Sequence, residues 1–275
     1  MLELPEAITM AKQLKEKVLG KEIVEIVLAQ SPHGFAFYSG DEAYYKALLV
    51  GKRITDAYAT GGYVELVAED ASLAFHDGTN IRYVAAGDKL PKKHQLYIGF
   101  ADGDGLVCTV QMYGGMHAHG DGMERSEYYR VALEKPNPLS DAFDGGYFYD
   151  IVAAAKPNLS VKGLIATEQR IPGVGNGCLQ DILFHGGLHP KRKVESLSVE
   201  DVERLYQSLK DTLREMTEAG GRDTEKDLYG NPGGYRTILS AKTWKAPCPA
   251  CGGWIERKAY MGGNVYYCPH CQPLE

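Results

Sequence analysis

The chain has 275 residues, of which 44% are hydrophobic and 24% are charged, and its formal net charge is −6. These fractions are those of a globular protein and exclude a disordered class, while the length exceeds a single core of roughly 100 to 200 residues. No apolar run approaches the ~20 residues that cross a bilayer, and the acidic start does not resemble a secretory signal, which predicts a cytoplasmic protein without a membrane partner.

The first residues, "MLELPEA", allow two interpretations. Pro5 suits the first turn of a helix, and a carboxylate at Glu6 complements the positive end of the helix dipole. Alternatively, a terminal amine beside Glu3 places a nucleophile next to a group that can move protons. The residues alone favour the first interpretation, a helix from about Pro5 to Leu19.

Residues 20–125 predict a sheet. Short apolar or alternating runs favour strands at 22–29, 34–39, 63–68, 72–77, 95–102 and 106–113. The sequence Asp102-Gly103-Asp104-Gly105 is typical of a hairpin turn between the last two. We therefore expect a β-sandwich with a leading helix.

Two histidines, His117 and His119, follow the last of these strands in "GGMHAHGDGME". Their spacing can ligate a metal from a strand, and Asp121 and Glu124 are close in sequence. The sequence favours an exposed polar loop over a metal site, and the role of the two histidines stays open.

The middle of the chain predicts helices. One helix begins at Ser160, and after a turn at 171–177 a second, shorter helix ends at Gly186-Gly187. A longer helix begins at the capping residue Ser198 and ends near Ala219.

The turn between the first two of these helices has the sequence "PGVGN" and is flanked by basic residues, among them Lys162 and Arg170. Glycines let backbone amides approach a phosphate, and the following helix offers the positive end of its dipole. The pattern favours a nucleic-acid-binding helical hairpin.

Four cysteines near the carboxyl terminus form two CxxC pairs, at Cys248, Cys251, Cys268 and Cys271. This spacing is typical of a structural zinc site, in which four thiolates surround the ion, and predicts one Zn²⁺ per chain. The segments "WIERKAY" and "NVYY" between the pairs predict a β-hairpin. Two disulfides are the less favoured alternative, because the sequence does not show a secretory signal, and Cys108 and Cys178 are expected to be unpaired thiols in the core.

Taken in order, the start "LPE", the strings "NPLSDAF" and "GVGN", "GLHP" and the terminal cysteines resemble the formamidopyrimidine-DNA glycosylase and endonuclease VIII (Fpg/Nei) family. The resemblance implies a multidomain α+β fold with DNA in the cleft between its domains. It implies an N-terminal β-sandwich at 1–130, a helix-two-turn-helix DNA-binding domain at 131–240 and a zinc finger at 241–275.

The resemblance also implies a base-excision chemistry. In the family the amine of an N-terminal proline attacks the sugar of a flipped, damaged nucleotide, the following Glu acts as acid, and elimination cleaves the strand. Glu3 and Glu6 match the family's acidic positions and are the candidate catalytic residues. Asn176 matches its phosphate-contacting Asn; with Lys162, Arg170 and Gly175 it forms the candidate DNA-binding set. The four cysteines match the zinc ligands.

Several positions depart from the family pattern. Leu2 stands where the family has its nucleophilic proline, and we expect Met1 to be retained before so large a side chain. Gly62 replaces a Lys and Gly263 replaces an Arg. Met112, Tyr113 and Gly114 stand where the family has the Arg and Phe residues that fill the gap left by a flipped base.

The losses concern the nucleophile and the cations that act at the lesion, which leaves three hypotheses. The favoured one is a protein that binds double-stranded or damaged DNA without cleaving it. The second is an active glycosylase and AP lyase of altered mechanism that uses Glu3, the Met1 amine or both. The third is a scaffold that binds RNA or a protein. The lesion and the oligomeric state stay open.

Overall fold

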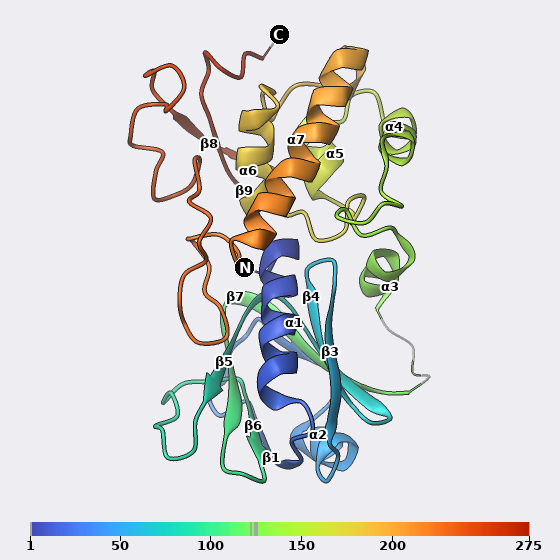
Figure 1. Cartoon of the computed structure of the whole chain (residues 1–275), viewed down its shortest axis with the longest axis vertical. Coiled ribbons are helices and arrows are strands. Elements are labelled where there is room, and N and C mark those ends of the chain that lie inside the picture. Colours follow the sequence, from blue (N-terminus) through green and yellow to red (C-terminus); the bar gives the residue numbers. More distant parts are fainter. Residues whose placement is uncertain (1, 122, 124–125, 275) are drawn as a thin grey trace.

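The computed structural model describes residues 2–121, 123 and 126–274. Figure 1 shows two lobes stacked along the long axis, with the strands in the lower lobe and most of the helices and the terminal hairpin in the upper one. Helix α1 (Leu4–Val18) lies on the strands and points toward the upper lobe. Among the described residues, no helix is both long enough and apolar enough to cross a membrane.

The lower lobe is the expected β-sandwich. Its strands pair in the order β1-β6-β7-β5-β4-β3, and β2 pairs in parallel with β7. Strand β4 pairs with the first part of β5, whereas β6 pairs with the first part of β7, so the two long strands link the two layers. The bounds are β1 Ile23–Leu28, β2 Ala36–Tyr38, β3 Ile54–Thr60, β4 Tyr63–Ala68, β5 Ala71–Val84, β6 Leu96–Phe100 and β7 Gly105–Gly120.

Helix α1 connects the two lobes through two different faces. Ala7, Met10, Ala11 and Leu14 recur at helical spacing and are buried in the core of the sandwich. Leu4, at the start of the helix, is buried instead in the core of the upper lobe. The opening residues are therefore the start of a helix, as predicted, and they lie at the junction of the lobes.

The upper lobe contains helices α4 (Gly145–Ala153), α5 (Val161–Ala166), α6 (Asn176–His185) and α7 (Val199–Glu218), and the short 3₁₀ helix Val194–Ser196. The expected caps are present, because the Ser160 side chain accepts from the Gly163 N–H and Ser198 forms a reciprocal capping box with Asp201. The shared apolar core, with Leu179 and Leu209 among its members, fixes the α5–α6 turn at the junction with the sandwich.

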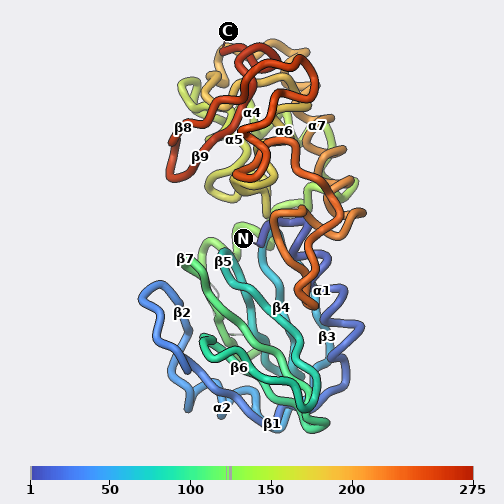
Figure 2. The backbone as a smooth tube through the Cα atoms, turned by 90° about the vertical axis from the view of Figure 1, so that its left-hand side faces the viewer, coloured from blue at the N-terminus to red at the C-terminus, as the bar shows by residue number. Residues whose placement is uncertain are grey.

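The terminal hairpin consists of β8 (Glu256–Tyr260) and β9 (Gly263–Tyr267), as the sequence predicts. It docks on α6 through Gln180, whose side chain accepts from the Tyr266 N–H and donates to the Asn264 carbonyl. Gln272 is fully buried and donates to the Leu188 carbonyl. Figure 2 shows this hairpin above the gap between the lobes, on the same side as the labelled parts of β5 and β7.

The structure contains elements that the sequence did not predict. Helix α2 (Glu42–Leu49) precedes β3, which was also missed, and α3 (Glu127–Glu134) crosses the expected domain boundary at 130/131. Tyr129 and Ala132 of α3 pack on Tyr63 of the sandwich.

The prediction that His117 and His119 lie in an exposed loop is wrong. Both residues lie within β7 and are partly buried, because β7 continues to Gly120 and pairs there with β5. The His117 ring is 5.1 Å from that of His76, and burial together with these neighbouring histidines lowers the pKa of His117 to about 4. Asp121 lies beyond the strand, and Glu124 lies outside the described residues.

Candidate nucleic-acid interface

A cavity of about 410 Å³ lies at the junction of the lobes. Its walls come from the start of α1, the turn between β3 and β4, the middle of β5 and of β7, the α5–α6 turn and the tip of the β8–β9 hairpin. The lining includes Leu2, Glu3, Gly62, Asp77, Asn176 and Gly263. Segments far apart in the sequence thus meet here, and they include most of the positions that the sequence comparison with the family marks as departures.

Glu3 lies on one wall of this cavity and is 3% exposed. Its carboxylate accepts hydrogen bonds from the backbone N–H groups of Gly175, Gly177 and Cys178, at 3.1, 2.7 and 2.7 Å. These groups are at the amino end of α6, where a carboxylate also interacts favourably with the helix dipole. The amides that the sequence suggested for a phosphate, including that of Gly175, therefore bind a side chain of the protein itself.

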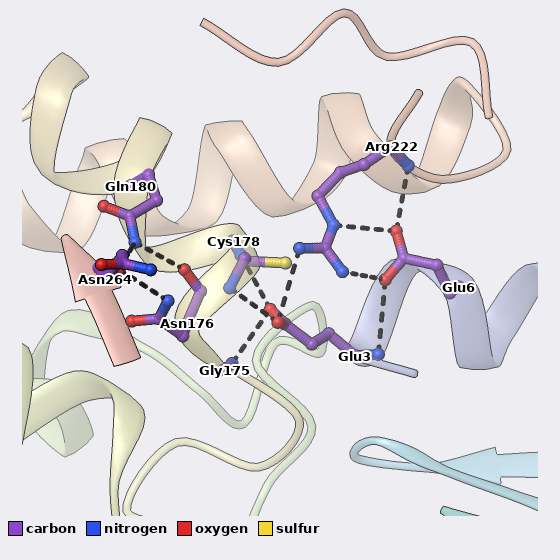
Figure 3. Close-up of polar contacts among 9 residues, drawn as sticks. Glu3, Glu6, Gly175, Asn176, Cys178, Gln180, Arg222 and Asn264 are labelled. Atoms are coloured by element: carbon purple, nitrogen blue, oxygen red, sulfur yellow. Dashed lines mark hydrogen bonds and ion pairs between the residues drawn. The ribbon is translucent and has the colours of Figure 1, made fainter. Parts of the chain in front are cut away.

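Arg222 completes this arrangement from the loop after α7 (Figure 3). Its guanidinium contacts both carboxylate oxygens of Glu6 through Nε and Nη2, at 3.0 and 2.6 Å, and lies 3.4 Å from Glu3. The side chain is 2% exposed, so the ion pairs are buried. At Gly177 an added Cβ would lie 1.3 Å from the Arg222 Nη1 atom, which explains why glycine is needed there.

The electrostatics of Glu3 follow from these contacts. Burial by itself raises the pKa of the Glu3 carboxyl, but the charge of Arg222 and the hydrogen bonds from Cys178 and Gly177 lower it by more. The pKa of Glu3 is therefore held below its usual value, and the group is ionised. The same carboxylates hold the pKa of Arg222 well above its usual range despite burial.

Leu2 occupies the position that the family gives to its nucleophilic proline. Its backbone nitrogen donates to the Asp77 carbonyl at 2.8 Å, and the residue is 8% exposed. Gly62 lies against it, since an added Cβ would be 3.1 Å from the Leu2 carbonyl oxygen. Met1 lies outside the described residues, so the expectation that its amine is turned away from the cleft stays a prediction.

Asn176, the first residue of α6, is held between the upper-lobe helices and the terminal hairpin. Its Nδ2 donates to the Asn264 carbonyl at 2.9 Å, and its Oδ1 accepts from Lys162 Nζ at 2.8 Å. Lys162 also donates to the Tyr260 carbonyl, and burial lowers its pKa. Gly263 lies beside the Asn176 amide: a Cβ added at Gly263 would be 3.3 Å from Asn176 Nδ2.

Arg170 does not join this group. It borders a separate cavity with Lys135 and Ile151, donates to the Gly163 carbonyl and pairs with Glu168. The structure thus brings Asn176, Lys162 and Gly175 to the central cavity, and it places Arg170 outside the residues that line it.

The four cysteines of the terminal hairpin form a compact cluster. Their sulfur atoms all lie within 4.8 Å of one another, with Cys248 and Cys271 at 3.8 Å and Cys251 and Cys268 at 3.5 Å. Because Zn–S bonds are about 2.3 Å long, tetrahedral thiolates are about 3.8 Å apart, so the cluster fits such an ion. It can therefore hold a metal.

Two groups in the site were missed by sequence reasoning. Arg222 follows Gly220-Gly221 in a segment, 220–235, that the sequence analysis did not assign to the site. In the structure this segment is anchored, because Arg222 is buried and the Leu228 carbonyl accepts from the Tyr83 N–H. The second group is the pair of His76 and Asp77 in the middle of β5, whose contact nothing in the local sequence suggests.

The arrangement can be compared with known proteins. The family model for the formamidopyrimidine-DNA glycosylase N-terminal domain matches residues 1–138. The family model for the formamidopyrimidine-DNA glycosylase H2TH domain matches residues 135–227. The chain belongs to the formamidopyrimidine-DNA glycosylase family. The resemblance seen in the sequence and the fold it implied are thus confirmed.

Relatives and solved structures cover nearly all of the chain. The formamidopyrimidine-DNA glycosylase of Thermus thermophilus is 30% identical over 99% of this chain and 98% of its own. The crystal structure of the MutM (Fpg) protein from Thermus thermophilus has a TM-score of 0.80 at 27% identity, with 98% of each chain covered. A Lactococcus lactis Fpg in complex with DNA containing an abasic site has a similar fold, with a TM-score of 0.81 at 21% identity, and 98% of this chain and 99% of that one covered.

Proposed function

We propose that this family member binds double-stranded or damaged DNA across the junction of its lobes and lacks the family's amine-dependent glycosylase and AP lyase chemistry. Membership in the family and the fold shared with an Fpg bound to abasic-site DNA support DNA as the partner. Asn176 and Lys162 supply donors for the phosphates, consistent with the match of Asn176 to the family motif.

The proposed loss of chemistry rests on the hydrogen bonds of the Leu2 backbone nitrogen and the Glu3 carboxylate. The nitrogen at the nucleophile's position is an amide that donates to Asp77, and an amide lone pair is delocalised into its carbonyl group. The neighbouring carboxylate is ionised and bound by three backbone donors and Arg222, which leaves it unsuited to deliver a proton. Glu3 and Glu6 then act as structural anchors rather than as catalysts.

The alternative of an active glycosylase needs either Glu3 or the Met1 amine as a reactive group. No contact of the described residues favours it, since the Glu3 carboxylate faces its donors inside the protein. An RNA- or protein-binding scaffold is likewise without a specific observation in its favour.

We propose zinc as the ion of the four-cysteine cluster. Its four thiolates suit Zn²⁺, which is almost always bound tetrahedrally in structural sites. The residues that would hold it are Cys248, Cys251, Cys268 and Cys271, and the ion would supply structure rather than chemistry, because no open coordination position remains.

The proposal predicts binding without a covalent intermediate. On a duplex with one abasic site, borohydride should trap no adduct above that of protein whose amino terminus is acetylated, and strand cleavage should not exceed the same control. Binding of a non-hydrolysable abasic analogue, measured in parallel by fluorescence anisotropy, shows that the protein is active as a binder. Efficient trapping that is lost in Glu3→Gln would contradict the proposal and support the altered glycosylase.

A second prediction concerns Asn176. If its amide reaches a phosphate, Asn176→Ala should weaken duplex binding by about 1 to 3 kcal/mol, largely independently of sequence. Asn158→Ala, an exposed position of the same lobe, is the matched control and should leave the Kd unchanged. Equal affinities of the two variants at low salt would place the DNA on another surface.

A further inference from the structure

One wall of the central cavity carries a carboxylate among aromatic rings. Asp77 lines the cavity with Tyr63, Tyr113 and Tyr128, and its side chain is 39% exposed. Its negative charge adds to burial in raising the pKa of all three phenols, as expected for hydroxyl groups that lie close to it. The wall therefore combines three aromatic side chains with one negative charge.

The backbone holds Asp77 in place. It has a left-handed conformation, with φ of +56°, and sits at a bulge in the pairing of β5 with β7. Its carbonyl accepts from the Leu2 N–H, and its carboxylate contacts His76 Nδ1 at 2.9 Å. A non-glycine residue held in this sparsely populated region marks a position that the surrounding structure fixes, and such strain is concentrated at binding sites.

The charges around the cavity exclude a phosphate from this wall. Among the residues that line the cavity in the described part of the chain, Lys162 is the one Lys or Arg, and its ammonium contacts Asn176 and the Tyr260 carbonyl rather than Asp77. Glu3, the other acidic residue of the lining, is neutralised by Arg222, whereas the side-chain partner of Asp77 among the described residues is His76 and not a Lys or Arg. A ligand group that meets Asp77 and the tyrosines is thus favoured when it is planar, cationic and a hydrogen-bond donor.

We propose that this wall binds an unstacked nucleobase that carries a positive charge, the chemical class of N-alkylated purines. Aromatic faces attract a delocalised cation, and a carboxylate adds charge complementarity and accepts from the base's amino and imino groups. A cavity of about 410 Å³ accommodates one base displaced from the helix. The inference rests on the proposed function, because the base must arrive as part of bound DNA.

The test uses duplexes in which one unpaired, bulged base is varied. The cationic probe is 7-methylguanine on a 2′-fluoro sugar, which resists depurination, and its neutral isostere is 7-methyl-7-deazaguanine on the same sugar. Fluorescence anisotropy with the full chain should give a Kd for the cationic duplex about tenfold lower than for the isostere.

Asp77→Asn isolates the charge, because Asn keeps the size of the side chain and tolerates positive φ better than other residues. The tenfold ratio should fall to about one in this variant, because the affinity for the cationic duplex should fall about ten times more than that for the neutral duplex. Tyr128→Leu, at a half-exposed position, should lower the ratio, and Tyr58→Leu on β3, outside the cavity lining, should not.

Equal Kd values of the parent for the two duplexes, or a ratio that persists in Asp77→Asn, would overturn the inference and leave the proposed function standing. Failure of the parent to bind either duplex would instead overturn the proposed function, and the inference with it.

Discussion

Arg222→Met should destabilise the protein by about 3 to 5 kcal/mol at pH 7, the range found when one partner of a buried ion pair is removed. Methionine is unbranched and fills much of the space, so the loss is mainly that of the charge. Glu3 and Glu6 then remain as buried carboxylates, of which Glu6 loses its two guanidinium contacts. Urea unfolding monitored by circular dichroism measures the effect.

Arg214→Met is the matched control. Arg214 pairs with Asp211 within α7, and both side chains are more than half exposed, so its loss should cost less than about 1 kcal/mol. Similar midpoints for the two variants would mean that the buried pair contributes no more to stability than a surface pair.

The pH dependence gives an independent check on the same cluster. The pKa of Glu3 is depressed in the folded state, so its contribution to stability is present above the pKa of the unfolded chain, about 4.3, and is lost as pH falls through the folded value. In Arg222→Met burial dominates and raises the pKa of Glu3, so protonation stabilises the variant's fold. The difference between parent and variant should therefore be largest near pH 7 and shrink below about pH 4.

Much of the fold was predictable because its signals are local. The caps at Ser160 and Ser198 and the turn at Asp102 to Gly105 act within a few residues, and the structure contains each of them. The departure at Leu2 depends on the identity of one residue, and its consequence for the chemistry stays a prediction. The spacing of the two CxxC pairs is likewise a local signal for a metal site, and in the structure their sulfur atoms lie close together.

The site itself depends on contacts that sequence distance hides. Arg222 lies 216 residues from Glu6, and its role follows from burial against α1, which no local pattern encodes. The error at His117 and His119 has a related cause, because β7 extends through a glycine-rich segment by pairing with β5 and β2. Residues read as a polar loop are there stabilised by tertiary hydrogen bonds that outweigh local preference.

The same buried cluster would explain how the family fold persists in a member that lacks the chemistry, as we propose for this chain. The carboxylates that the family resemblance assigns to catalysis are kept, but each is bound to groups of the upper lobe, Glu3 to the start of α6 and Glu6 to Arg222. They join α1 of the lower lobe to the helices of the upper one. Selection for stability alone would therefore retain Glu3 and Glu6.

Removal of the metal should have the largest effect, and it should reach the DNA interface. Structural zinc contributes about 10 to 16 kcal/mol to the folding of small zinc modules, so Cys268→Ser should unfold the terminal hairpin and spare both larger units. The hairpin's Asn264 carbonyl holds the Asn176 amide at 2.9 Å, and Gln180 binds both segments. We therefore expect weaker duplex binding together with rapid amide exchange confined to residues 244–274.

Elemental analysis, hydrogen exchange and anisotropy on the same preparations check this outcome. Cys108→Ala, which removes a buried thiol outside the cluster, should keep about one zinc per chain and parent-like binding. If the ion acts on DNA through Asn176, adding Asn176→Ala to Cys268→Ser should weaken binding by much less than Asn176→Ala does in the zinc-bound protein, because the two changes share one contact. Full additivity of the two losses would show that the hairpin meets DNA independently of Asn176, and protein isolated without zinc would refute the metal assignment.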